Sequence, residues 1–193
     1  MGIEFELKFR ATPEILSAVE ASVPGAANHF QMETVYYDTP SQAFAAKHFT
    51  LRRRLENGVG VCTLKTPAGG NARREFETEA ATIEAAIPVL CKLSGMDALS
   101  AMAAEGLQPV CGAKFHRIAK TLVLENCTLE LALDQGVLMG GAKEQPLCEL
   151  EVELKSGVRE DATAYAAQLA KKYCLEAEPL SKFARARQLS QQP

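Results

Sequence analysis

Charged and apolar residues alternate at every second position in several stretches of the chain, and this alternation constrains the fold more than any other feature. On a β-strand, successive side chains point to opposite faces. In the first stretch, residues 3–10, one face therefore carries apolar side chains and the other carries charged ones. A strand of a half-solvated sheet would show the same pattern. Rows of the same kind elsewhere in the chain decide whether the charged face meets water or a polar interior.

Further segments carry such rows, and the signs of their charges are sorted. Arg52 and Arg54 form one basic row, and Lys65 belongs to another. The acidic rows are Glu75, Glu77 and Glu79; Glu130 and Asp134; and Glu149, Glu151 and Glu153. Charges of one sign on one face repel each other unless ions of the opposite sign lie among them. Because solvated strands would carry mixed charges, the sorting favours a shared polar interior.

The two kinds of row suit two kinds of ligand. Clustered carboxylates bind hard divalent cations such as Mg²⁺ or Mn²⁺. Arginine and lysine side chains bind phosphate oxygens. A metal ion together with a polyphosphate would satisfy both sets. Without metal, crowded glutamates repel each other, so we expect some of them to hold protons near neutral pH.

The apolar spacing and the turn signals predict an α+β protein with mostly hairpin-connected strands. A helix is expected from Pro13 to the Pro24-Gly25 stop, two short helices between Thr82 and Gly106, one at 160–173, and a last one opened by Ser181. Strands are expected near 30–38, 48–56, 59–66, 72–79, 110–121, 122–126, 128–134 and 147–155, with a turn at Asp134-Gln135-Gly136. No linker divides the sequence, so we expect a single domain over residues 1–193. This order indicates an antiparallel sheet or a closed barrel with helices outside.

Composition excludes several other classes of protein. A net charge of −3 over 193 residues argues against a broad nucleic-acid surface. The sequence has no apolar run long enough for a membrane helix and no signal peptide, which predicts a cytoplasmic protein. The six cysteines show no C-x-x-C spacing and are expected to be free thiols. The spacing of the three histidines does not suggest a zinc site.

An ordered set of motifs resembles the CYTH superfamily, the triphosphate tunnel metalloenzymes. The motifs span nearly the whole chain: Glu4-x-Glu6-x-Lys8, Tyr36-Tyr37-Asp38-Thr39-Pro40, Leu51-Arg52-x-Arg54, Thr63-Leu64-Lys65, Arg74-Glu75-Phe76-Glu77, Arg117, Leu133-Asp134-x-Gly136, Glu149-Leu150-Glu151-Val152-Glu153, and Ser181-Lys182 with Arg185. The likeness is greatest to bacterial inorganic triphosphatases of this family. Their C-terminal histidine-rich helical domain, called CHAD, is not found within these 193 residues. One position departs from the pattern, because Phe115 stands where many members carry a lysine.

The resemblance implies a closed antiparallel eight-stranded barrel whose charged interior forms a tunnel. It also implies the roles of the charged residues. Metal ligands are expected to be Glu4, Glu6, Glu149 and Glu151, with Glu153 extending the acidic set. Phosphate is expected to be held by Lys8, Arg52, Arg54, Lys65, Arg117, Lys182 and Arg185. The supporting acidic residues would be Glu75, Glu77, Glu130 and Asp134, and catalysis would depend most on Glu6, Lys8, Arg54 and Lys65.

The activity implied by the resemblance is hydrolysis of inorganic triphosphate to pyrophosphate and phosphate with Mg²⁺ or Mn²⁺ as cofactor. The alternatives are a class IV adenylyl cyclase, a thiamine triphosphatase and a non-catalytic triphosphate or polyphosphate sensor. A sensor could lose metal ligands, whereas this sequence keeps both glutamate pairs, which favours catalysis. The partners implied are a small-molecule triphosphate and a second copy of the chain, with no nucleic acid and no membrane.

Overall fold

The computed structural model describes residues 2–69 and 73–191, with side chains from Phe5 onward. The strands are β1 (Gly2–Glu4), β2 (Glu6–Arg10), β3 (Ala27–Asp38), β4 (Thr50–Glu56), β5 (Val59–Pro67), β6 (Arg73–Glu79), β7 (Gln108–Val123), β8 (Cys127–Gly140), β9 (Lys143–Gly157) and β10 (Glu176–Ala177). The helices are α1 (Pro13–Ser22), α2 (Ala43–Ala46), α3 (Ile83–Ser94), α4 (Ala98–Ala103), α5 (Arg159–Tyr173) and α6 (Lys182–Gln191). The strands form one antiparallel sheet in the order β1-β6-β5-β4-β3-β7-β8-β9-β2-β10.

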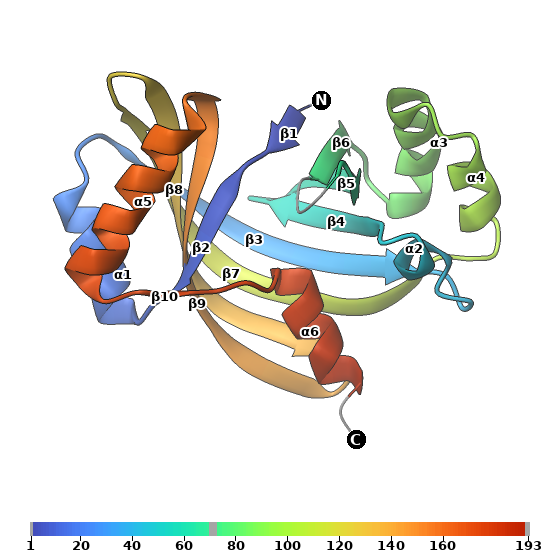
Figure 1. Ribbon diagram of the computed structural model, residues 1–193. Helices are drawn as coiled ribbons and strands as arrows, with labels where there is room; N and C mark the ends of the chain where they lie inside the picture. Colours follow the sequence, from blue (N-terminus) through green and yellow to red (C-terminus); the bar gives the residue numbers. More distant parts are fainter. Residues whose placement is uncertain (1, 70–72, 192–193) are drawn as a thin grey trace.

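The N-terminal segment connects the two sides of this sheet. β1 pairs with β6, and β2, on the other side of Phe5, pairs with β9. The sheet is therefore strongly curved, as Figure 1 shows. Over the described residues, its hydrogen-bonded order nevertheless has ten strands and two ends, β1 and β10. The prediction of a closed eight-stranded barrel is wrong for this structure, because the first strand is split at Phe5 and a two-residue strand is added beside β2.

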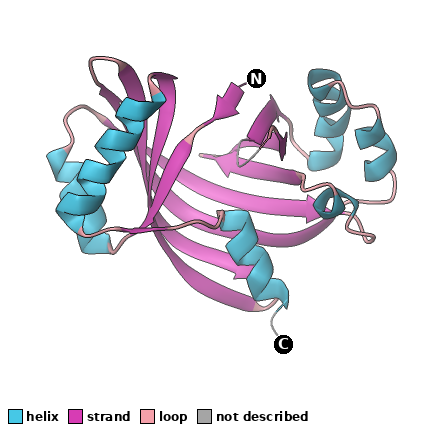
Figure 2. Ribbon diagram, in the orientation of Figure 1, coloured by secondary structure: helices cyan, strands magenta, loops and turns pink. Residues whose placement is uncertain are grey.

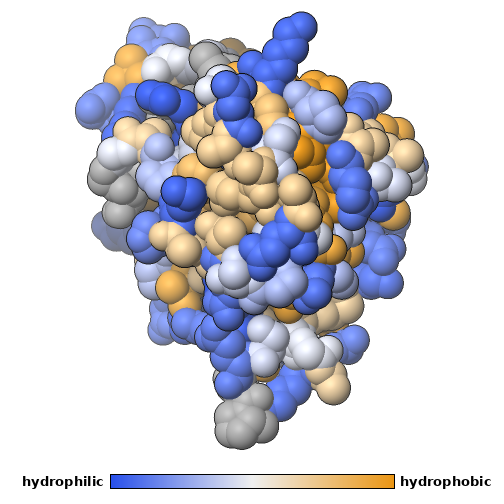
Figure 3. All heavy atoms as spheres, turned by 90° about the vertical axis from the view of Figure 1, so that its right-hand side faces the viewer, coloured by the Kyte–Doolittle hydropathy of each residue, from blue (hydrophilic) through white to orange (hydrophobic). Residues whose placement is uncertain are grey.

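Two apolar clusters attach helices to the outer face of the sheet. One packs Leu16 and Val19 of α1 and Ala166 of α5 against β2, β8 and β9. The apolar face of the stretch 3–10 is expected to pack outward, and Phe5, Leu7 and Phe9 belong to this cluster, which confirms the expectation for them. The side chain of Ile3, the fourth residue of that face, lies outside the described residues. The second cluster packs α2, α3 and α4 against β4, β5 and β6. The surface over α3 and α4 mixes apolar and hydrophilic areas (Figure 3), and Val89 and Leu93 of α3 are exposed.

The last helix occupies a different place from the others. Ala186 and Leu189 of α6 pack in a third cluster with Met32, Tyr36 and Phe115. Met32 is the register partner of Phe115, and Tyr36 is the partner of Arg52, so this cluster lies on the face that carries the charged rows. α6 therefore packs against the inner face of the curved sheet (Figure 2). The prediction that all helices pack outside is wrong for α6.

The predicted turn at Asp134-Gln135-Gly136 is also wrong, because β8 runs through it to Gly140. Gly136 supplies close contact rather than a turn: a Cβ there would lie 2.1 Å from the carbonyl oxygen of Lys114. The strands predicted at 110–121 and 122–126 are largely one strand, β7, which ends at Val123. The short elements α2 and β10 were not predicted, because four and two residues carry no periodic signal.

Buried leucines under α1 and α5 contribute to the stability of the sheet. Leu131 of β8 is fully buried in the first cluster, so truncation leaves a cavity that the surroundings fill only in part. We predict that Leu131→Ala lowers the free energy of unfolding by about 2–5 kcal/mol in urea denaturation. The control is Val123→Ala at a side chain that is 74% exposed, for which we expect a change within about 0.5 kcal/mol. Equal effects of the two substitutions would contradict this packing.

Candidate functional site

The strand register assembles the inner charged rows across β2, β9 and β8. Glu6, Glu153 and Glu130 are register neighbours in one row. Lys8 and Glu151 lie in the next row, followed on β8 by Ala132. The third row contains Arg10, Glu149 and Asp134, and continues to Arg117 on β7. Residues far apart in the sequence thereby form one charged wall.

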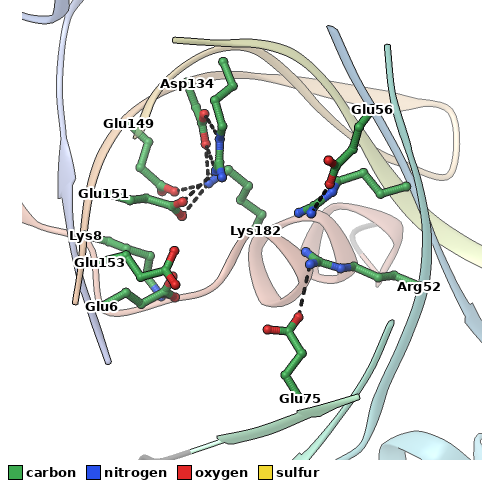
Figure 4. A network of polar contacts seen from close by, with 12 residues as sticks. Glu6, Lys8, Arg52, Glu56, Glu75, Asp134, Glu149, Glu151, Glu153 and Lys182 are labelled. Carbon is green, nitrogen blue, oxygen red and sulfur yellow. Dashed lines mark hydrogen bonds and ion pairs between the residues drawn. The ribbon is translucent and has the colours of Figure 1, made fainter. Parts of the chain in front are cut away.

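Three carboxylates of this wall form a cluster around a single ammonium group. Oxygen atoms of Asp134, Glu149 and Glu151 lie within 4.8 Å of one another. The Nζ of Lys182, at the start of α6, lies 2.8 Å from Asp134 Oδ2 and 2.7 Å from Glu151 Oε1, and also contacts Glu149 Oε1 (Figure 4). We refer to these three carboxylates as the carboxylate cage.

Two arginines bind the same cage from other directions. Arg117 donates two hydrogen bonds of 2.7 Å to Asp134 and one of 2.6 Å to Glu151 Oε2. Arg185, one turn along α6 from Lys182, donates to Glu149 Oε2. Asp134 and Glu149 are almost completely inaccessible to solvent. Such buried carboxylates require these partners, because an unpaired buried charge is strongly destabilising.

The pKa values of two carboxyl groups in the cage are shifted in opposite directions. Burial raises the pKa of Glu149 to about 7, and the neighbouring carboxylate of Glu151 adds to this effect, although Lys182 opposes it. Burial would also raise the pKa of Glu151, but Lys182 and Arg117 outweigh it and hold that pKa well below the ordinary value. The same carboxylates raise the pKa values of Lys182 and Arg117 against the effect of burial. The cage therefore holds one carboxyl group that titrates near neutral pH.

A second group of cations lies on the opposite wall, on β4 and β5. Glu75 Oε1 accepts from Arg52 and Lys65, each at 3.3 Å. Arg52 also lies 3.8 Å from Glu77, which accepts a 2.8 Å hydrogen bond from the Thr63 hydroxyl. Figure 4 shows this group facing the cage across the interior. The structure thus places a carboxylate-rich wall opposite a second wall on which arginine and lysine are paired with glutamates.

Arg54 is the least compensated cation of this second group. It forms an ion pair with Glu56, but its Nε is buried and makes no hydrogen bond within the described part of the chain. Burial lowers the pKa of Arg54, and the nearby positive charge of Arg52 lowers it further. The Nε of Arg185 is buried without a hydrogen bond among the described residues as well. These donors point to an anion as the missing partner.

The structure brings together only part of the predicted metal set. Glu149 and Glu151 lie in the cage, and they are joined there by Asp134, which was predicted only as a supporting residue. Glu6 and Glu153 lie in the neighbouring row, where Glu6 contacts Lys8 at 3.4 Å and Glu153 contacts Lys155 at 3.1 Å. Glu130 lies in that row too. The side chain of Glu4 is outside the described residues.

The cations predicted to bind phosphate are distributed over both walls. Lys8, Arg117, Lys182 and Arg185 lie at the acidic wall, whereas Arg52, Arg54 and Lys65 lie opposite. Among the supporting residues, Glu75 and Glu77 hold these opposite cations. All the predicted side chains that the structure describes therefore surround the same interior. Their roles toward metal and phosphate remain predictions.

Three further residues contribute to the site. Glu56 holds Arg54, and Glu178 accepts from Arg10 at 2.9 Å and lies 3.6 Å from Arg185. The ring of Phe115 lies 5.7 Å from the Arg117 guanidinium and 5.5 Å from the Lys182 ammonium, as ring-centroid distances. The aromatic ring thus supports two cations. Glu178 lies in a loop, where no periodic pattern marks it.

A family model described as the CYTH domain matches residues 2–186. The chain therefore belongs to the CYTH family. It is 33% identical over 130 residues to an inorganic triphosphatase of Haemophilus influenzae, a match that covers 65% of this chain and 36% of that protein. An uncharacterised protein of Mycobacterium tuberculosis is 32% identical over 93 residues, or 48% of this chain and 17% of that protein. The chain thus spans well under half the length of these curated relatives.

Solved structures share the fold. HpAC1 from Hippeastrum, a proposed adenylyl cyclase described as having a dominant triphosphatase activity, aligns with a TM-score of 0.67 and 18% identity, covering 100% of this chain and 98% of that one. The PH1819 protein of Pyrococcus horikoshii aligns with a TM-score of 0.59 and 22% identity, covering 93% and 96%. At these identities the likeness shows the fold alone. Separately, none of the described helices has the length and apolar character needed to cross a membrane.

The titration of Glu149 predicts how stability depends on pH without metal. Its folded pKa of about 7 lies above the ordinary 4.5, so between these values the folded protein binds more protons than the unfolded chain. The stability contributed by this group is complete below about pH 4.5 and is lost as the pH rises through about 7. We predict that the free energy of unfolding of the wild type, relative to Glu149→Gln, falls by about 1–3 kcal/mol from pH 5 to pH 8.

The measurement is urea denaturation in EDTA at each pH. Glu160→Gln, on an exposed position of α5, controls for the loss of one carboxylate. Parallel pH curves for the wild type and Glu149→Gln would show that Glu149 is already fully ionised at pH 5.

Proposed function

We propose that the protein is a divalent-metal-dependent hydrolase of inorganic triphosphate. The observation that carries this proposal is the arrangement of two walls around one interior: a buried carboxylate cage on one side, and on the other Arg54, whose Nε is buried without a hydrogen bond among the described residues. A polyphosphate with a bound metal ion matches both walls, because the metal satisfies carboxylates and the phosphates satisfy guanidinium groups. Family membership and the similarity to the Haemophilus triphosphatase support the same reading.

The cage fits Mg²⁺ or Mn²⁺ by its donor set. Asp134, Glu149 and Glu151 offer carboxylate oxygens, which such hard cations prefer, and Glu6 and Glu153 in the neighbouring row can extend the set. A bound ion would neutralise charge on the phosphate oxygens and polarise the phosphorus that is attacked. Because the mechanism needs little more than positioning and a placed water, the chain requires no separate nucleophile.

The remaining residues orient the substrate. Arg52, Arg54 and Lys65 would bind phosphate oxygens on the second wall, while Glu75 and Glu77 fix the directions of Arg52 and Lys65. Lys8, Arg117 and Arg185 would bind oxygens on the acidic side. Glu130 lies in the row of Glu6 and Glu153, where it adds negative charge near the cage. Each cation thereby opposes the charge that develops as the terminal phosphoryl group is transferred.

Substrate choice is decided by an activity panel. Phosphate release is measured with tripolyphosphate, ATP and thiamine triphosphate, each with Mg²⁺ or Mn²⁺, alongside an assay for cyclic AMP. We expect the fastest release from tripolyphosphate. Preferential cyclic AMP formation would assign a class IV adenylyl cyclase instead, and binding without turnover of any compound would assign a sensor. The expectations of a cytoplasmic location and a homodimer are tested by fractionation and by light scattering.

Metal removal is the second test. We predict that excess EDTA abolishes phosphate release, because the cage then has no ion to bring to the phosphates. The far-ultraviolet circular dichroism spectrum should stay nearly unchanged, since Lys182 and Arg117 compensate the cage in the metal-free protein. Full activity in EDTA would contradict the proposed chemistry.

Arg54 offers a direct test of the phosphate wall. We predict that Arg54→Ala lowers kcat/KM for tripolyphosphate by about 10²–10³-fold, because a buried charged donor to the transferred group is lost. The matched control is Arg74→Ala, which removes an arginine from an exposed position of β6. We expect the control to stay within about threefold of the wild type. Equal losses in the two variants would mean that a general electrostatic field, rather than a specific contact, explains the effect.

A further inference from the structure

We infer that the Lys182 ammonium acts as an exchangeable cation: it occupies the carboxylate cage in the metal-free protein and moves to the triphosphate when a divalent metal enters. This inference rests on the proposed function and adds a coupling to it. Metal and triphosphate would each favour binding of the other. The metal would replace Lys182 at the carboxylates, and the triphosphate would bind the released ammonium.

The contacts in the cage carry this inference. Lys182 Nζ contacts one oxygen from each of the three carboxylates, at 2.8 Å for Asp134 and 2.7 Å for Glu151. A metal ion held by one oxygen of each of these carboxylates would compete with the ammonium for the same cluster. An ammonium group and a divalent ion cannot share them, since both carry positive charge and would lie within a few ångströms of each other. Metal binding to the cage therefore requires Nζ to leave.

Arg117 and Arg185 need not leave in the same way. Arg117 approaches through both oxygens of Asp134 and through Glu151 Oε2, and Arg185 approaches through Glu149 Oε2. Arg117 and Lys182 share Asp134 Oδ2. The carboxylate oxygens of Glu149 and Glu151 that face these arginines differ from those that face Lys182. Lys182 is therefore the cation whose position competes most directly with a metal ion.

The released ammonium needs a new partner. The Lys182 side chain is only 10% exposed, so water cannot fully solvate its charge. The nearby Phe115 ring can support the cation but cannot neutralise it. A buried charge without a counterion is costly, and a bound triphosphate supplies the counterion. The cost of leaving the Lys182 ammonium without a counterion, which opposes metal binding, is thus removed when the substrate binds. This is positive coupling between two ligands.

The test measures binding rather than turnover. A non-hydrolysable imido-linked triphosphate is titrated calorimetrically into the wild type and Lys182→Met, once in EDTA and once in saturating Mg²⁺. In EDTA the substitution should change the affinity by less than about threefold, because the cage already holds the ammonium. In Mg²⁺ it should weaken binding by more than about tenfold, because the ammonium now contacts the anion. Equal losses under both conditions would overturn the inference.

Metal binding without triphosphate provides the reciprocal measurement. Free Mn²⁺ is followed by electron paramagnetic resonance, and Lys182→Met should bind Mn²⁺ at least about tenfold more tightly than the wild type. Lys65→Met is the matched control: it removes one positive charge from the opposite wall, where Lys65 pairs with Glu75, and should change Mn²⁺ affinity by less than about threefold. Unchanged affinity in Lys182→Met, or equal gains in both variants, would overturn the exchange.

A measurement on the wild type guards against misfolding of the variant. In protein labelled with ¹⁵N-lysine, the Lys182 ammonium protons should exchange slowly with water in EDTA and give an NMR signal. Mg²⁺ alone should remove that signal. The signal is assigned by its absence in Lys182→Arg. A signal unaffected by Mg²⁺ would contradict the exchange. Phosphate release from tripolyphosphate is measured in parallel, and its absence would overturn the proposed hydrolase while the binding data still decide the exchange.

Discussion

The ion pairs of Lys182 and Arg117 with the carboxylate cage are the interaction on which the rest of the structure depends. Asp134, Glu149 and Glu151 lie on neighbouring strands of a curved sheet, so folding forces their charges together in a buried space. A carboxylate cluster of this kind would open the sheet if it were left uncompensated. The two cations come from β7 and from α6, and they therefore tie the C-terminal helix to the strands. Charge compensation, rather than apolar contact alone, closes this side of the molecule.

The position of α6 follows from the same requirement. Its apolar residues Ala186 and Leu189 cover Met32, Tyr36 and Phe115 on the inner face, and its first turn delivers Lys182 and Arg185 to the acidic wall. One helix thus fills the apolar part of the interior and neutralises the polar part. Phe115 lies at the boundary between the two, because it belongs to the apolar cluster and its ring also contacts Lys182 and Arg117. A lysine at this position would have placed a further charge beside two cations that are already crowded.

Much of this arrangement was predictable from the sequence, because strand parity fixes which face a side chain occupies. The inward rows from Glu6 to Glu153 and the outward Phe5, Leu7 and Phe9 follow from alternation alone. What parity cannot give is the distance between strands that are far apart in the sequence. Asp134 lies in the cage because of the register between β8 and β9. Gly136 was interpreted as part of a turn, since glycine is common in turns, but here it allows close contact between strands. The inward placement of α6 could not be predicted either, because the helix presents charge at its start and small apolar residues later, a pattern common on outer surfaces as well.

The split of the first strand at Phe5 has a consequence for how the chain acquires its shape. β2 needs β9 (Lys143–Gly157) as its hydrogen-bonding partner, so β2 leaves the ribosome long before the segment with which it pairs. The hairpins from β3 to β6 can form meanwhile from local contacts, but the two sides of the sheet join only after β9 has been synthesised. Such long-range pairing makes folding slow and leaves strand edges exposed while it proceeds. In the folded protein the apolar side of β2 packs against α1 and α5. Until that packing forms, this side is the surface most in need of protection from other chains.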